Sequence, residues 1–159
     1  RAQHTRARRP SLQQTTKTMS RNIYFAGSIR GGRDDRELYH RIIQQLKQYG
    51  QVFTEHIADP ALEKDLNMDD KEIHDRDMEW LHKSDALVAE CTQTSLGVGY
   101  EIGRAVALNK KILCLYRPQT GKRLSAMIRG AEGDGSPLIC KDYKEEELPE
   151  ILKTFFASL

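Results

Sequence analysis

Two carboxylates and one glycine-rich segment are the parts of this chain best suited to chemistry. The segment Ser95–Arg104 follows the apolar run Ala86–Glu90, which predicts a strand, and contains three glycines. Glycine has no Cβ, so backbone can approach a ligand closely there. Glu101 falls in or near the first turn of a predicted helix at 100–109, where the positive end of the helix dipole favours an ionised carboxylate. Such a group can attack an electrophilic carbon or stabilise a cation. The alternative is an ordinary glutamate on a solvated helix.

The second carboxylate is Asp77, in a predicted helix at 69–83. It shares one helical face with three apolar residues: Ile73, Trp80 and Leu81. Burying a carboxylate costs on the order of several kcal/mol unless it is paired or protonated. Asp77 is therefore expected to have a dedicated partner or a raised pKa, and both suit a general acid. A structural salt bridge, or a helix rotated slightly from this register, is the alternative. Two carboxylates in different settings are typical of glycosidic cleavage, where one attacks or stabilises the sugar carbon and the other moves protons.

A further glycine-rich loop, Gly27-Ser28-Ile29-Arg30-Gly31-Gly32-Arg33, follows the first apolar run of the chain. Its backbone N–H groups, the Ser28 hydroxyl and Arg30 suit a phosphate. The loop lacks the Gly-Lys-Ser/Thr of a P-loop, which argues against triphosphate hydrolysis. Three more polar side chains follow other predicted elements, although each also fits an ordinary loop or surface position: His56, Ser95 and Ser125.

Strands and helices alternate along residues 21–159. Short apolar runs predict strands at 23–26, 51–54, 86–89, 111–116 and 138–140. Helical spacing predicts helices at 34–48, closed by Gly50 as a C-terminal cap, and at 69–83, 100–109 and 145–156. This alternation is typical of a single α/β domain with a doubly wound, flavodoxin-like or Rossmann-like sheet of five parallel strands. Ligands bind beyond the carboxyl ends of such strands, which selects the loops 27–33, 55–56, 91–101 and 117–127.

Charge is unevenly distributed along the chain. Five of its 25 Lys and Arg residues, and none of its 23 Asp and Glu residues, lie within 1–20. The rest is mildly acidic, which argues against a nucleic-acid-binding surface. The basic tail 1–20 has no hydrophobic period, so we expect it to be disordered. It lacks the apolar core of a secretory signal, while a transit peptide or a nuclear-type basic patch stays open. Met19, just before the folded part, is a candidate natural start.

The three cysteines, Cys91, Cys114 and Cys140, contain no Cys-x-x-Cys motif, so zinc binding and dithiol redox chemistry are not indicated. Unpaired thiols suit a reducing compartment, which predicts a cytoplasmic location, a nuclear location or both. No apolar run approaches the ~20 residues of a membrane span.

Five stretches, taken in order, resemble the nucleoside 2-deoxyribosyltransferase-like family, and within it the enzymes that hydrolyse 2′-deoxynucleoside 5′-phosphates. They are 23–33, 54–56, 77–81, 95–104 and 124–130. The resemblance spans essentially residues 22–157 and includes every predicted ligand loop. Several motifs in order are far more specific than any one of them.

The resemblance implies hydrolysis of 2′-deoxynucleoside 5′-monophosphates to free base and 2-deoxyribose 5-phosphate, without a metal or an organic cofactor. Glu101 would be the nucleophile of a covalent intermediate, Asp77 the proton-transfer residue and Tyr24 the residue that positions sugar and nucleophile. The implied phosphate contacts are Ser28, Arg30 and Ser95, the implied positions near the nucleobase are Gly27, Ile29 and His56, and Gly31 and Gly97 complete the substrate loops.

The resemblance also implies a homodimer, in which the partner subunit contributes Ser125 to the phosphate and Met127 to the base. The apolar turn Leu124–Ile128 supports this, because a monomer would leave it partly exposed in an otherwise polar loop. No nucleic acid or membrane partner is implied.

Two other functions compete with this interpretation. The spacing Gly97-x-Gly99-x-x-x-Gly103 loosely matches the loop of an NADP-dependent oxidoreductase. However, the six residues from Cys91 to Leu96 make too long a connection for the usual tight turn, and the next strand ends in Arg117 rather than an acid, although an arginine suits a 2′-phosphate. A non-catalytic nucleotide-binding module would not need both carboxylates.

Overall fold

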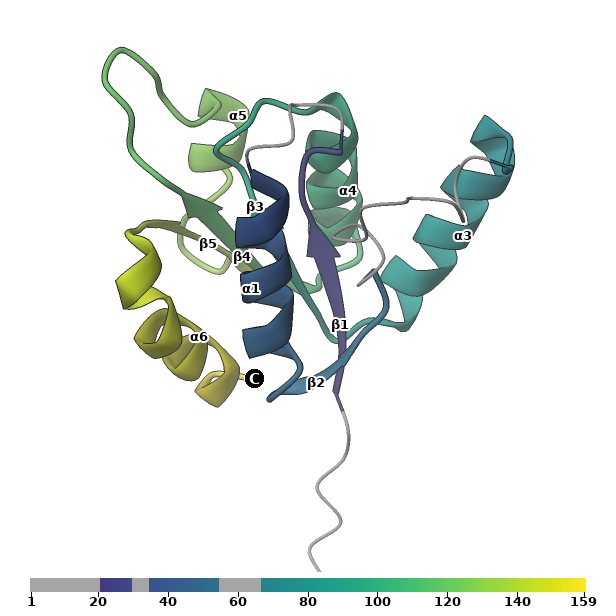
Figure 1. Ribbon diagram of the computed structural model, residues 1–159, viewed down its shortest axis with the longest axis horizontal. Coiled ribbons are helices and arrows are strands. Elements are labelled where there is room, and N and C mark those ends of the chain that lie inside the picture. The colour runs from purple at the N-terminus through teal and green to yellow at the C-terminus, as the bar shows by residue number, and fades with distance from the viewer. Residues whose placement is uncertain (1–20, 30–34, 55–66) are drawn as a thin grey trace, which may run out of the picture.

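The computed structural model describes residues 21–29, 35–54 and 67–159. Its centre is a five-stranded sheet in the order β2-β1-β3-β4-β5, and every neighbouring pair is parallel (Figure 1). The strands are β1 (Arg21–Ala26), β2 (Gly50–Val52), β3 (Ala86–Glu90), β4 (Lys111–Tyr116) and β5 (Leu138–Asp142). The predicted doubly wound parallel sheet is therefore confirmed.

Helices cover both faces of the sheet, which is why the strands can be apolar throughout. On one face, α1 (Arg36–Leu46) and α6 (Leu148–Ala157) pack with β-strand residues in one apolar cluster. On the other face, α3 (Asp70–Lys83) and α4 (Leu96–Ala107) enclose a second cluster, which also takes in residues beside the short helix α5 (Ala126–Arg129). The central strand β3 is buried along its whole length. A short 3-10 helix, η3 (Glu145–Glu147), leads into α6.

The sheet order places a topological switch between β1 and β3. From β1 the chain continues through α1 to β2 on one side, and from β3 it continues through α4 to β4 on the other side. The two connections diverge at the carboxyl ends of neighbouring strands, which opens the crevice where doubly wound folds bind ligands.

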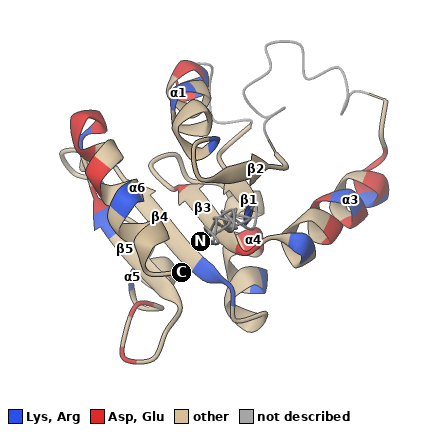
Figure 2. Cartoon of the chain, turned by 90° about the horizontal axis from the view of Figure 1, so that it is seen from below, with Lys and Arg blue, Asp and Glu red and all other residues tan. Residues whose placement is uncertain are grey.

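Helix α3 begins where the sequence predicts and is the most polar helix of the fold. Asp69 and Glu72 form a capping box at its start, in which each carboxylate accepts the other residue's backbone N–H at 2.8 Å. Only Met78 and Leu81 of α3 are buried, and acidic and basic residues occur along its length (Figure 2). The first turns of α3 accordingly extend away from the sheet (Figure 1).

The start of α4 corrects the predicted helix at 100–109. The helix begins at Leu96, because the Ser95 hydroxyl accepts the backbone N–H of Val98 at 3.3 Å and caps it. The glycines of this segment therefore lie inside the helix rather than in a strand-to-helix turn, which also argues against the dinucleotide-loop alternative. A Cβ on Gly99 or Gly103 would meet no described atom within 4 Å apart from the helix's own backbone, so the packing of the described residues does not require glycine at either position.

The ends of α1 and β2 also differ from prediction. Gly50 does not cap α1, which ends at Leu46; it is the first residue of β2, where a Cβ would collide with the carbonyl oxygen of Arg21. β2 ends at Val52, two residues before the predicted end, because the Thr54 side chain takes the place of the backbone hydrogen bonds that would continue the strand pairing with β1. Its hydroxyl accepts the Phe25 N–H at 2.8 Å and donates to the Phe25 carbonyl at 2.6 Å.

None of the helices within the described residues has the length and apolarity that crossing a membrane requires.

Candidate active site

A cavity of about 500 Å³ opens at the carboxyl ends of β1 and β3. One wall is Gly27, Ser28 and Ile29, directly after β1, and the other is formed by 94–98 and Glu101 at the start of α4. This is the crevice that the sheet order predicts. Six of the predicted site residues line it together: Gly27, Ser28, Ile29, Ser95, Gly97 and Glu101.

Glu101 is the acid of this cavity, and its side chain is partly buried. It lies in the second turn of α4, and its Oε2 atom is buried without a hydrogen bond to any described residue. The pKa of Glu101 is raised to about 7: burial raises it most, a hydrogen bond from Tyr24 lowers it, and the Asp77 charge raises it. The prediction placed Glu101 in or near the first turn of the helix, whereas it lies in the second turn, where the helix end has little effect on its carboxylate. The effect of desolvation on the pKa of Glu101 exceeds that of the helix dipole, because the helix starts a full turn earlier than predicted.

Tyr24, on β1 of the sheet, contacts Glu101. It lies on β1 with 1% of its surface exposed, and its side chain enters the apolar cluster beneath α4. Its hydroxyl donates a hydrogen bond to the Glu101 carboxylate. Burial, followed by the charges of Glu101 and Asp77, raises the pKa of Tyr24 far above its ordinary range. Tyr24 thus stays protonated and acts as a permanent donor to the acid.

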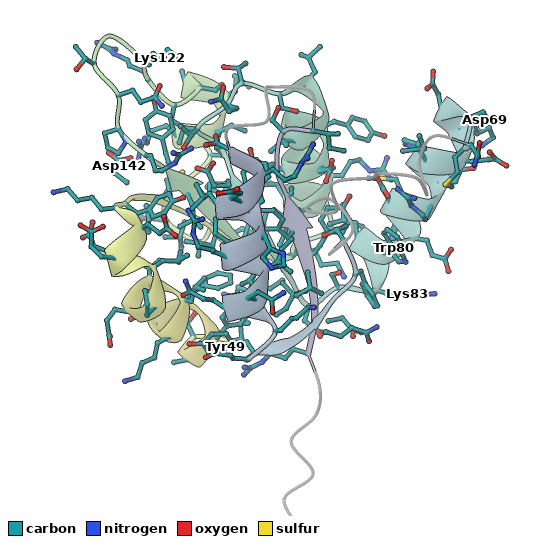
Figure 3. The ribbon with its side chains drawn as sticks, viewed as in Figure 1. Tyr49, Asp69, Trp80, Lys83, Lys122 and Asp142 are labelled. Atoms are coloured by element: carbon teal, nitrogen blue, oxygen red, sulfur yellow. The ribbon has the colours of Figure 1, made fainter. Side chains whose placement is uncertain are left out.

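Asp77 approaches the same pair from α3, but its surroundings differ from those predicted. The buried stripe of α3 runs through Met78 and Leu81, and Asp77 stands at its edge with its side chain 21% exposed. The predicted dedicated partner is present, since Arg76 contacts the Asp77 carboxylate with Nε at 3.0 Å and Nη2 at 2.9 Å. The Arg76 guanidinium also lies 4.7 Å from the centre of the Trp80 ring, which Figure 3 labels on α3. The Asp77 charge reaches both Glu101 and Tyr24.

The first turn of α4 forms the other end of the cavity. Ser95 caps the helix and Gly97 lines the cavity, so the free backbone N–H groups and the dipole of a twelve-residue helix face this region. The site therefore combines a raised-pKa acid with a helix end suited to an anion.

The profile of a family described as nucleoside 2-deoxyribosyltransferase matches residues 23–133 of the chain, which include this cavity, Tyr24 and Asp77. The chain belongs to this family.

Individual relatives extend the similarity. A Nematostella vectensis protein, provisionally named 2′-deoxynucleoside 5′-phosphate N-hydrolase 1, is 60% identical over 144 residues, which cover 89% of this chain and 97% of the relative. A Danio rerio protein named 5-hydroxymethyl-dUMP N-hydrolase is 58% identical over 141 residues, covering 87% and 97%. The solved structure of a CMP N-glycosidase from Clostridium botulinum superposes with a TM-score of 0.61 at 22% identity, covering 84% of this chain and 98% of that one. That structure shares the fold.

Five predicted residues of this family member are not described at the cavity. Arg30, Gly31 and His56 fall outside the described residues. Ser125 is the N-cap of α5 and accepts the Met127 N–H at 3.3 Å, while Met127 is 83% exposed. Within one described chain, neither of them lines the cavity.

Sequence reasoning missed several residues of the site. Thr94, Leu96 and Val98 line the cavity, and Leu96 is 94% exposed at its edge. They fall within the predicted ligand loop 91–101, but no sequence pattern singled out any of the three. Tyr39 of α1 was not identified from the sequence at all, although it lies against Gly27. Across 21–29, 35–54 and 67–159, no three His, Cys, Asp or Glu side chains are grouped as they would be to hold a metal ion.

Proposed function

We propose that this chain hydrolyses the N-glycosidic bond of 2′-deoxynucleoside 5′-monophosphates and releases a free base and 2-deoxyribose 5-phosphate. The observation that carries the proposal is the partly buried Glu101, whose Oε2 atom is fully enclosed. It is hydrogen-bonded by Tyr24 and influenced by Asp77 in a cavity that also contains a helix N-terminus. The names of the relatives, which describe N-hydrolases of this nucleotide class, support it.

Glu101 is the nucleophile in the proposed reaction. One of its oxygens bonds to C1′ of the sugar while the C1′–N bond breaks, and the departing base keeps the electron pair and accepts a proton that the Asp77 carboxylate takes up from solvent and passes on. Water then attacks C1′ and gives a proton to Asp77, and the ester to Glu101 breaks. A 2-deoxyribosyl centre suits this step, because it has no 2′-hydroxyl to withdraw electrons from the developing cation.

Tyr24 and the helix end have separate tasks. The Tyr24 hydroxyl holds one carboxylate oxygen and favours the ionised nucleophile, since its hydrogen bond lowers the pKa of Glu101. The N-terminus of α4, with Ser95 and Gly97, and the opposite wall at Ser28 would bind the 5′-phosphate. By the family resemblance Arg30 adds a charge there. Phosphate binding at a distance from C1′ orients the sugar over Glu101.

The experiment incubates the purified chain with dGMP and with 5-hydroxymethyl-dUMP and measures free base by chromatography. We expect base release from at least one, loss of about three orders of magnitude in Glu101→Ala, and an enzyme adduct of 2-deoxyribose phosphate by mass spectrometry after rapid quenching. The exposed Glu79→Ala, on α3, is the matched control and should keep full turnover. Failure of the wild-type chain to release base from any 2′-deoxynucleoside monophosphate would refute the function. Near-normal turnover in Glu101→Ala would refute only the role of that residue.

We also propose that the active form is a homodimer with shared sites. The apolar turn Leu124–Ile128 is partly buried within its own chain, because Leu124 belongs to the apolar cluster under α3 and α4 and Ile128 packs against that cluster. The support instead comes from large apolar side chains that stay exposed, with Leu96 at 94% on the cavity wall and Met127 at 83% beside Ser125. A second subunit would cover them and bring Ser125 and Met127 to the cavity.

A mixing experiment tests the shared site. Glu101→Ala and Ser125→Ala subunits are combined and allowed to exchange. If sites are shared, each heterodimer has one intact site, so random exchange should restore about a quarter of wild-type activity. No recovery after verified exchange would show that each site is built from one chain.

A further inference from the structure

The cavity wall formed by residues 27–29 is held from behind by Tyr39 of α1. Tyr39 is 3% exposed, and its hydroxyl oxygen accepts the backbone N–H of Ser28 at 3.2 Å. Its ring covers Gly27, where a Cβ would stand only 2.8 Å from Cε2 of the ring. One side chain therefore makes both a polar and a steric contact with consecutive residues of the cavity wall.

The core fixes the Tyr39 ring itself. The ring packs edge-on against Phe25, with centroids 5.5 Å apart and an interplanar angle of 64°, inside the apolar cluster under α1 and α6. The Thr54 hydroxyl in turn holds the backbone of Phe25 through hydrogen bonds with both its N–H and its carbonyl oxygen. Because close-packed interiors leave side chains little freedom, the ring offers a rigid surface to the residues that follow β1.

A buried charged cluster surrounds the hydroxyl end of Tyr39. The Arg117 Nη2 atom lies 2.7 Å from Asp35 Oδ2 and 3.7 Å from Glu90 Oε2, and Glu90 is fully buried at the end of β3. The Thr92 hydroxyl donates a hydrogen bond to the Glu90 carboxylate and accepts one from the backbone N–H of Arg117 at 2.9 Å. This connects the ends of β3 and β4. Burial and the Glu90 charge raise the pKa of Tyr39 well above its ordinary value. The hydroxyl thus keeps its proton and still offers a lone pair to Ser28.

We propose that Tyr39 is a positioning residue for the substrate, because its hydroxyl and ring together set where the backbone of Gly27 and Ser28 stands in the cavity. Tyr39 does not line the cavity, so it acts only through these two residues. The inference rests on the proposed function, since it assigns to this wall the binding of the nucleotide. Nothing in the reaction consumes or changes Tyr39, so its loss should affect binding more than chemistry.

The test is Tyr39→Phe, which keeps the ring over Gly27 and removes the acceptor for Ser28. We expect KM for the 2′-deoxynucleoside monophosphate to rise about fivefold to tenfold, the ratio that a typical net hydrogen bond corresponds to, while kcat changes less than about twofold. The matched control is Tyr143→Phe. Tyr143 lies 2% exposed in the same apolar cluster, and its buried hydroxyl makes no hydrogen bond with any described residue. Both kinetic constants should stay at the wild-type value in that control.

A second measurement is independent of activity. Amide hydrogen exchange of Ser28, followed by NMR in the full chain, should accelerate at least about tenfold in Tyr39→Phe and stay unchanged in Tyr143→Phe, since only the first variant removes the Tyr39 acceptor from that N–H. Unchanged Ser28 exchange, or kinetic constants that match those of Tyr143→Phe, would overturn the assignment. If the wild-type chain released no base while Ser28 exchange still accelerated in Tyr39→Phe, the proposed function would fail and the positioning of Ser28 by Tyr39 would stand.

Discussion

The burial of Glu101 should make this protein less stable as pH rises, and Glu101→Gln should remove that loss. The pKa of Glu101 is about 7 in the folded chain, against an ordinary value of 4.5. The folded state therefore holds this proton more tightly than the unfolded state does. The associated stability is fully present below about pH 4.5 and is lost as pH rises through about 7. Glutamine has nearly the same shape, carries no charge and can still accept the hydrogen bond from Tyr24.

The size of the effect follows from the two pKa values. At about 1.36 kcal/mol for each pH unit between them, ionising Glu101 in the folded chain costs about 3 kcal/mol by pH 8.5. We expect the free energy of unfolding of Glu101→Gln, minus that of the wild type, to grow by about this amount between about pH 4 and pH 8.5. Urea unfolding at equal protein concentrations measures this difference, and equal concentrations are needed because subunit association shifts apparent stability.

Glu79→Gln provides the matched control on α3. Glu79 is solvent-exposed, and its pairing with Lys83 lowers its pKa, so any pH dependence should be slight and opposite in sign. A difference curve for Glu101→Gln that stays flat from pH 4 to pH 8.5 would refute the argument that Glu101 is desolvated.

Two other predictions concern Tyr24 and Gly27. The value of kcat/KM should rise with pH as Glu101 ionises near pH 7. Tyr24→Phe should move this rise to higher pH, because the hydrogen bond that the variant loses is one that lowers the pKa of Glu101 in the wild type. The phosphate of the substrate titrates identically with both enzymes, so an unshifted profile would exclude the Tyr24 contact. Gly27→Ala should raise KM more than about tenfold, because the new methyl group would stand 2.8 Å from the Tyr39 ring. Gly133→Ala, where a Cβ meets no described atom within 4 Å, should leave kinetics unchanged, and equal kinetics in both variants would show that the wall can shift freely.

The order and type of the elements followed from the sequence because periodicity reports burial directly. All five strands and the helices at α1, α3, α4 and α6 lie where apolar spacing predicts, and the capping box fixed the start of α3. Boundaries failed where a side chain replaced backbone bonding, as Thr54 does at the end of β2. They also failed where a serine before a glycine-rich stretch is compatible with a loop and with a helix cap, as at Ser95.

The sequence predicted six residues that line the cavity, but it also predicted Ser125 and Met127, which do not line it within one described chain, and it did not predict the electrostatics. The sheet order brings Gly27, Ser95 and Glu101 together, and the carboxyl-end rule was enough to expect this. The pKa of Glu101 depends on how deeply the side chain is buried, and no local pattern of residues reports that depth. Tyr39 was hidden for a similar reason, since its contact with Gly27 joins two elements across the wall and leaves no periodic signal.

The correction at Glu101 changes how α4 serves the proposed reaction. A helix end stabilises a nearby anion by only about 0.3–1 kcal/mol and only within its first turn, so the dipole of α4 acts at Ser95 and Gly97 and hardly at Glu101 in the second turn. The positive end of the helix thus remains available for the phosphate, and burial acts on the carboxylate. A nucleophile with a pKa of about 7 is more basic than an ordinary glutamate and is still half ionised at neutral pH. One helix thereby provides two different environments one turn apart, an electropositive end for the phosphate and a desolvated acid for the sugar carbon.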